Sequence, residues 1–191
     1  MFPRVAFFAL IVLVLSTGFV PTASLAMDGS GKRTIEGRIA EVRESFPPQL
    51  VIESDDGKFE IGLSDATAIQ VEGRKRSYEA LQTGKLVRID GTSTSARSLT
   101  AERILLLEEI EGRIANVLDK PTRLVVARDG REVVVLLGKD TVVLDAKGKA
   151  SDRTNLRKDV SVRLRFYRQE DTETKKTVSH GSSVKILPPK P

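Results

Sequence analysis

The segment Ile35-Glu36-Gly37-Arg38-Ile39-Ala40-Glu41-Val42 returns as Ile110-Glu111-Gly112-Arg113-Ile114-Ala115-Asn116-Val117, 75 residues further along the chain. Seven of the eight residues are identical. Later matches keep nearly the same offset: Leu50-Val51-Ile52 with Leu124-Val125-Val126, Asp56-Gly57 with Asp129-Gly130, and Val87-Arg88-Ile89 with Val162-Arg163-Leu164. A fixed period over two copies indicates one folding pattern used twice, so we expect two small domains of one kind.

Each copy has the alternation of apolar and polar residues that is typical of half-buried strands. In the first copy the alternation slips near Ala40, which predicts a β-bulge. Asp55-Asp56-Gly57 predicts a tight hairpin, Glu72–Ser77 a polar loop, and Tyr78–Leu81 one helical turn; Asn155-Leu156 predicts the matching turn in the second copy. The sequence therefore predicts an all-β protein of two tandem five-stranded OB-like Greek-key barrels, each with a short helical turn between its third and fourth strands.

The repeated pattern resembles exported bacterial OB-fold-like domains of unknown function, here in tandem duplicate. The resemblance rests on Ile-x-Gly-x-Ile-x-x-Val, on the Asp-Gly hairpin, on Asp65-Ala66-Thr67 with Asp140-Thr141, and on Leu-x-x-Gly-x-x-Val. It covers nearly the whole chain after the N-terminal segment. The second copy departs from it by placing Asp159 where the first has Gly84. These motifs are structural, and the resemblance carries over no catalytic residue.

Residues 1–26 have the pattern of a signal peptide, with Arg4 at the start, an apolar run from Val5, and small residues at Ser24-Leu25-Ala26. A retained membrane anchor is the alternative, although the apolar run is shorter than the roughly 20 residues that cross a bilayer. We therefore expect export to the periplasm or medium after cleavage near Ala26. The expected order is a flexible segment at 27–33, domains at 34–108 and 109–187, and a disordered tail at 188–191.

Charge is divided unevenly along the chain. Residues 27–107 carry a net charge of −1 and residues 108–191 a net charge of +5. The second copy is thus the stronger candidate for a polyanion- or partner-binding face. Pairing with acids on neighbouring strands is the alternative role for these cations. The candidate residues are Arg163, Arg165, Tyr167, Arg168, Lys175 and Lys176, with Arg74, Lys75 and Arg76 in the first copy.

Two stretches, Ile104–Leu107 and Val133–Leu137, are apolar on both faces. Strands of this kind need cover on both sides. We expect Leu105, Leu107, Val134 and Leu136 to be covered by the other domain, or otherwise by a partner.

Side chains that carry catalysis or bind metals are scarce. The chain has no cysteine and a single histidine, His180, which leaves almost no ligands for a transition metal. No serine lies in a Gly-x-Ser-x-Gly elbow. The sequence analysis therefore predicts no metal, no cofactor, no catalytic residue and no enzymatic activity.

These features favour a non-catalytic, exported binding or interaction module of the cell envelope. Its partner would be an envelope protein or an anionic glycan or lipid headgroup. The alternative is single-stranded nucleic acid or another polyanion held by the basic face of the second domain. Nucleic acid is the less favoured of these partners, because stacking needs exposed aromatic side chains and the chain after residue 26 has five aromatics.

Overall fold

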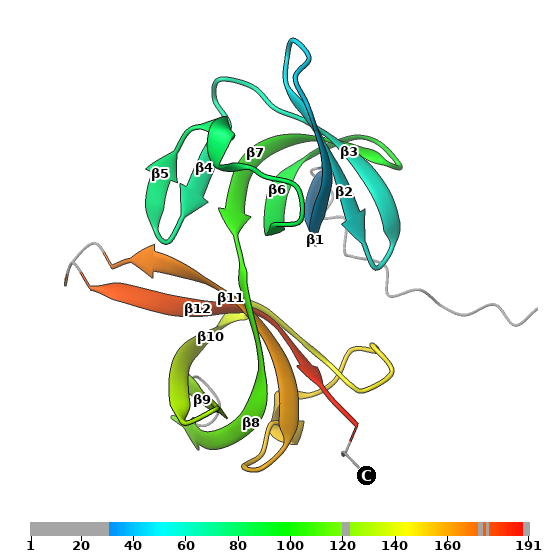
Figure 1. The fold of residues 1–191 in the computed structure, drawn as a ribbon. Helices are drawn as coiled ribbons and strands as arrows, with labels where there is room; N and C mark the ends of the chain where they lie inside the picture. Colours follow the sequence, from blue (N-terminus) through cyan, green and yellow to red (C-terminus); the bar gives the residue numbers. More distant parts are fainter. Residues whose placement is uncertain (1–30, 120–122, 172–173, 175, 189–191) are drawn as a thin grey trace, which may run out of the picture.

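The computed structural model describes residues 31–119, 123–171, 174 and 176–188 (Figure 1). The predicted signal peptide, most of the predicted flexible segment, Lys175 and residues 189–191 lie outside this range. The described residues form strands and two 3₁₀ turns, with no α-helix among them. The all-β prediction is confirmed.

Strands of the first half form one seven-stranded sheet in the order β3-β2-β1-β6-β7-β4-β5, and β3 also pairs with β7. Its strands are β1 (Lys32–Arg43), β2 (Gln49–Ser54), β3 (Gly57–Gly62), β4 (Ala68–Val71), β5 (Arg74–Arg76), β6 (Leu86–Ser95) and β7 (Ser98–Leu106). The second half forms a closed barrel in the order β10-β12-β11-β8-β9. Its strands are β8 (Glu108–Leu118), β9 (Arg123–Arg128), β10 (Arg131–Leu144), β11 (Ser161–Glu170) and β12 (Thr177–Ile186).

Five strand pairings in the first sheet have a counterpart in the barrel. β1 and β8 are counterparts: β1 pairs with β2 and with β6, and β8 pairs in the same way with β9 and with β11. The parallel pair β3–β7 of the first sheet corresponds to the parallel pair β10–β12 of the barrel. The antiparallel pairs β2–β3 and β6–β7 correspond to β9–β10 and β11–β12. The register shifts also correspond, because one lies between Ile39 and Glu41 and the other between Ile114 and Asn116. The bulge that the sequence predicts near Ala40 is therefore present, and it recurs at the repeated position.

The turn before β6 in the first half and the turn before β11 in the second have similar backbones despite the exchange of Gly84 for Asp159. Their φ angles are 85° and 67°, and their amides donate to Ile39 O at 2.7 Å and to Ile114 O at 2.8 Å. Aspartate is one of the few residues other than glycine that tolerates a left-handed conformation. The departure from the glycine pattern thus leaves the turn unchanged.

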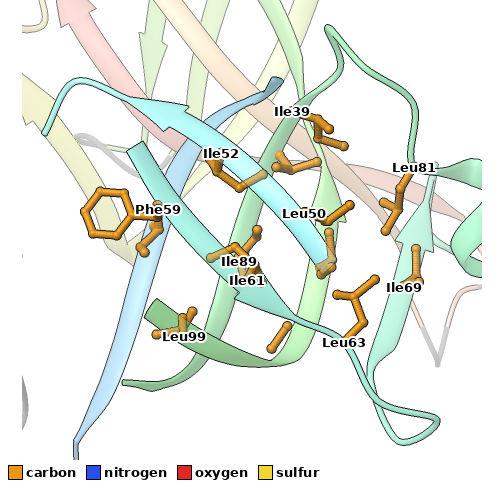
Figure 2. Packing of buried hydrophobic residues seen from close by; sticks show 14 residues of the cluster. Ile39, Leu50, Ile52, Phe59, Ile61, Leu63, Ile69, Leu81, Ile89 and Leu99 are labelled. Carbon is orange, nitrogen blue, oxygen red and sulfur yellow. The ribbon is translucent and has the colours of Figure 1, made fainter. Parts of the chain in front are cut away.

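Each half has its own apolar core. In the first, isoleucine and leucine side chains from β1, β2, β3, β4, β6 and β7 surround Ile61 and Ile89 (Figure 2). A second cluster, which includes Ile114, Val126 and Leu164, fills the barrel. Gly37 and Gly112 lie where strands approach closely, since a Cβ on either would be no more than 2.5 Å from a carbonyl oxygen of the neighbouring strand.

Three local predictions need correction. Arg74–Arg76, expected in a loop, is strand β5, which pairs with β4 through a turn at Glu72-Gly73. Both residues of this turn have positive φ, as a two-residue hairpin of type I′ requires. The expected helical turns are only three-residue 3₁₀ turns, η1 (Tyr78–Ala80) and η2 (Arg153–Asn155). β10 continues to Leu144, seven residues beyond the predicted end at Leu137.

The two halves are joined by a single residue, Leu107, between β7 and β8 (Figure 1). Its amide donates to Leu86 O at 2.9 Å, so the connection is held against the first sheet. A junction this short and without glycine permits little independent movement of the halves.

Candidate functional site

The two halves meet through a cluster of polar side chains. Ser182 of β12 is fully buried; its hydroxyl donates to Glu36 and accepts from Arg88 Nη1 at 3.2 Å. Ser183 also donates to Glu36, at 3.1 Å. Because Glu36 and Arg88 lie opposite each other on β1 and β6, the outer face of the first sheet is fixed to one strand of the barrel.

Two ion pairs between the halves, Arg165–Glu36 and Arg38–Glu109, extend this contact, and Arg165–Glu109 within the barrel links them. Arg165 Nη1 lies 3.9 Å from Glu36 Oε2, and its Nε donates to Glu109 at 2.9 Å. Arg38 of β1 also reaches Glu109, at 3.4 Å. The contact between the halves therefore carries charges of both signs that largely balance each other.

A cleft of about 810 Å³ lies beside this contact. The first sheet contributes charged side chains from β1, β6 and β7, and β10 contributes Asp140, Val142 and Leu144. Asp90 is half-buried here and accepts hydrogen bonds from Thr34 at 2.7 Å and from Arg103 at 2.6 Å. Burial raises the pKa of Asp90, but these bonds and the charges of Arg88 and Arg103 outweigh it, so the pKa lies below its ordinary value.

Three predicted cations of the second half are engaged in ion pairs between β11 and β8. Arg163 lies 2.5 Å from Glu111, Arg165 2.9 Å from Glu109, and Arg168 3.0 Å from Glu108. The hydrogen bond from Arg163 to Glu111 raises the pKa of this arginine. These guanidinium groups thus take the cross-strand role that the sequence left open as the alternative to a binding face.

The cations of β5 have a different setting. Arg74, Lys75 and Arg76 are all exposed, and none has a carboxylate within 4.0 Å among the residues that the structure describes. Pairing with Ile69 and Val71 places Arg76 and Arg74 on one face of the strand, and pairing with Gln70 places Lys75 on the other. We call these three residues the β5 surface.

The β5 surface lies next to the hairpin between β11 and β12. Gly73, in the turn before β5, pairs in parallel with Gln169, and a Cβ on Gly73 would lie 2.8 Å from Glu170 N. The β4–β5 turn is therefore next to the β11–β12 hairpin, to which Lys176 belongs. Lys176 is exposed, and Lys175 lies outside the described residues.

Aromatic side chains are divided between exposed and packed positions. Phe46, in the loop after β1, is fully exposed, and Tyr78, two residues after β5, is 48% exposed. Tyr167 instead stacks on His180, with ring centroids 5.5 Å apart. Burial lowers the pKa of His180, and the nearby charge of Asp171 opposes that shift.

The four leucines and valines expected to need cover behave differently. Leu105 and Leu107 are buried, and Leu105 lies opposite Arg88 on the face that meets β12. Leu136 is partly buried. Val134 is 49% exposed, so the other half does not cover it. The expectation that the first half covers Val134 is wrong, because β12 packs against β1 and β6 while the outer face of β10 near Val134 remains in solvent.

Sequence reasoning did not select Glu36, Arg88, Asp90 or Ser182. A signal was available for the first two, since both lie inside the repeated segments at the positions of Glu111 and Arg163. Ser182 carries no such signal, because a serine in an ordinary strand position gives no sign of burial.

Comparisons with known proteins show no family. No family model matches the chain, and no curated protein matches it. Similar solved structures include a complex of TiaS with tRNA and ATP, at 12% identity, covering 54% of this chain and 27% of that one, with a TM-score of 0.31. Another is a tRNA fluorescent labeling enzyme, at 13% identity, covering 79% of this chain and 32% of that one, with the same TM-score. The chain thus spans about a third or less of these structures.

One expectation is withdrawn on this basis. The sequence analysis predicted that the chain is not an enzyme, whereas the solved structures found here include one named as an enzyme. A TM-score of 0.31 assigns no activity either.

Among the described residues, no helix is both long and apolar enough to span a bilayer.

Proposed function

We propose that this chain is an exported binding module of the bacterial cell envelope that holds anionic polymers on the β5 surface. Its architecture would be a duplicated OB-like barrel, with the second copy fixed against the first. The five corresponding strand pairings support the duplication, and the N-terminal sequence pattern supports export. The ligand would present rows of phosphate or carboxylate groups, as acidic glycans and lipid headgroups do.

The observation that carries the proposal is the charge state of β5. The cations of β11 face carboxylates at 2.5 to 3.0 Å, whereas the described residues place none within 4.0 Å of the β5 surface. A cation without a counterion contributes fully to the field that attracts an anionic ligand. Of the cations that the sequence selected, those of β5 are therefore better candidates for the binding face than those of β11.

The β5 surface also has a structural role that would exist without any ligand. It forms the edge of the seven-stranded sheet, and charged side chains on an edge discourage pairing with other chains. The two roles differ in what they require. Protection of the edge needs charge of either sign, whereas binding of anions needs positive charge.

This difference defines the test. The variant Arg74→Glu/Lys75→Glu/Arg76→Glu keeps a charged edge and reverses its sign. The control Lys147→Glu/Lys149→Glu/Lys158→Glu makes the same change in net charge at three exposed lysines elsewhere. Binding would be measured by cosedimentation with vesicles containing phosphatidylglycerol and by titration with alginate, which separate lipid from glycan.

We expect the parent chain and the control to bind at least one of these ligands, and the β5 variant to lose at least tenfold in affinity. Binding should weaken as salt rises, because exposed charges are screened over about 10 Å at 0.1 M salt. Equal loss in the two variants, or no binding by the parent chain, would contradict the proposal.

Tyr78 supports a second candidate function, the binding of single-stranded nucleic acid. Its ring is exposed two residues after the β5 surface, which gives a base a platform beside a row of cations. The change Tyr78→Ala should then weaken binding of a fluorescent oligonucleotide at low and at high salt. An oligonucleotide that binds equally well without the ring would be held by charge alone, as any polyanion would be.

A further inference from the structure

Two arginines cover one end of the first core. Arg33, near the start of β1, lies with its guanidinium carbon 4.6 Å from the centre of the Phe59 ring. Arg97, in the turn between β6 and β7, lies 5.1 Å from the same centre. Phe59 belongs to the buried core and lies at its edge in Figure 2.

Neither arginine has a carboxylate partner within 4.0 Å in the described part of the chain. Arg33 Nη1 donates to Ala96 O at 3.1 Å, and Arg97 Nη1 donates to Asp56 O. The Nε of Arg33 is buried and has no hydrogen-bond acceptor. Buried donors are nearly always satisfied, so an unsatisfied one indicates that an acceptor is missing.

The corresponding end of the barrel is built differently. Arg33 lies two residues before Ile35, and the residue two before Ile110 is Glu108. Glu108 pairs with Arg168 at 3.0 Å. The barrel thus has an ion pair of zero net charge, Glu108 with Arg168, at this end. The first half has Arg33 and Arg97 there, and neither has a carboxylate partner among the described residues.

We propose that Arg33 and Arg97 form a binding site for one small oxyanion, either a phosphate, a sulfate or a carboxylate group. Guanidinium groups bind these anions through paired, charge-assisted hydrogen bonds. The anion would accept from the unpaired Nε of Arg33, once a movement of the side chain exposes this buried atom, and would balance the charge of both arginines. The cation–π contact with Phe59 helps to hold each guanidinium group in place before the anion arrives.

Arg33 lines the cleft beside the contact between the halves, so an anion would reach the Arg33 side of the site from this cleft. Asp55 and Asp56 line the same cleft. Their charge opposes an extended polyanion, which would carry many charges past them, more than it opposes a single small group. The site is independent of the β5 surface, and either one can exist without the other.

The first experiment is calorimetric titration of the chain with inorganic phosphate, sulfate and acetate. At least one of these ions should bind, and Arg97→Gln should reduce its affinity at least tenfold. Arg157→Gln is the matched control, because the side chain of this exposed arginine donates, among the described residues, to Thr154 O alone. Failure of all three ions to bind, or unchanged binding by Arg97→Gln, would overturn the proposal.

A second measurement follows Arg33, whose replacement could disturb the core. Arg33→Lys keeps the charge but removes Nε, so it should fold and still bind the ion more weakly than the parent. The NMR signal of Arg33 Nε–H should shift on addition of the bound ion, and an unmoved signal would contradict the assignment. The β5 triple variant should bind the same ion as the parent does. Titration with glycerol phosphate shows whether the natural ligand is a free ion or the end group of a larger molecule. Tighter binding of glycerol phosphate than of inorganic phosphate would indicate the end group of a larger molecule.

Discussion

Glu36 and Arg88 lie directly opposite each other on β1 and β6, yet both form hydrogen bonds to Ser182 of the other half. Their counterparts in the repeat, Glu111 and Arg163, also lie opposite each other and form an ion pair at 2.5 Å. The same two residue types thus have two roles. In the first half their face is covered by β12, and in the second it is open to water.

The contact at Ser182 should stabilise the protein measurably. Ser182→Ala would leave Glu36 and Arg88 each without one partner in a half-buried place. We expect the free energy of unfolding to fall by about 1–3 kcal/mol, measured by urea denaturation. Ser161→Ala, which removes a hydroxyl with no side-chain hydrogen bond among the described residues, should change it by less than about 0.5 kcal/mol. Equal effects would show that the contact contributes nothing specific.

Asp90 should make stability depend on pH. Because its pKa is lowered in the folded state, its contribution is complete above the unfolded pKa of about 4 and is lost as pH falls through the lower folded value. Asp90→Asn should therefore cost roughly 1 kcal/mol at neutral pH, a value discounted for partial exposure, and less at about pH 3. Urea denaturation at both pH values checks this, with the exposed Asp65→Asn as control. A cost that does not shrink in acid would contradict the prediction.

Gly37 and Gly112 should be intolerant of a methyl group. A Cβ would lie no more than 2.5 Å from Glu53 O in one case and from Ala127 O in the other, so the strands must move apart. We expect Gly37→Ala and Gly112→Ala each to destabilise by about 1–3 kcal/mol in thermal denaturation. Gly138→Ala has nothing within 4 Å of the new atom and serves as the control. A destabilised Gly138→Ala would point to backbone effects instead of contact.

Substitutions of Leu105 and Val134 should differ in their effect on stability, because Leu105 lies on a covered outer face and Val134 on an open one. Leu105 is 2% exposed and lies on the face that meets β12, whereas Val134 is in contact with water. Leu105→Ala should lower the free energy of unfolding by about 2–5 kcal/mol, and Val134→Ala by less than about 1 kcal/mol. A large effect of Val134→Ala that depends on protein concentration would instead reveal a partner that covers this valine.

The strand framework could be predicted from the sequence because it depends on local features. Alternation identified the barrel strands, the slip at Ala40 located the bulge, and Asp56-Gly57 located a hairpin. The strand β5 was missed, since a run of three cations has low strand propensity. Its pairing with β4 depends on the Glu72-Gly73 turn, whose signal was read as a loop.

The sequence by itself determined the all-β class and which residues share each face of a strand. The tertiary structure alone decided what covers those faces. A period of two places Glu36 and Arg88 outside their sheet, but only the packing of β12 makes their outer face an interface and buries Ser182. In the same way, charge counting favoured the second half, and only cross-strand neighbours showed that Arg163, Arg165 and Arg168 are paired and that the cations of β5 are exposed. Alternation is a property of one strand, whereas burial and pairing are properties of the strands that meet it.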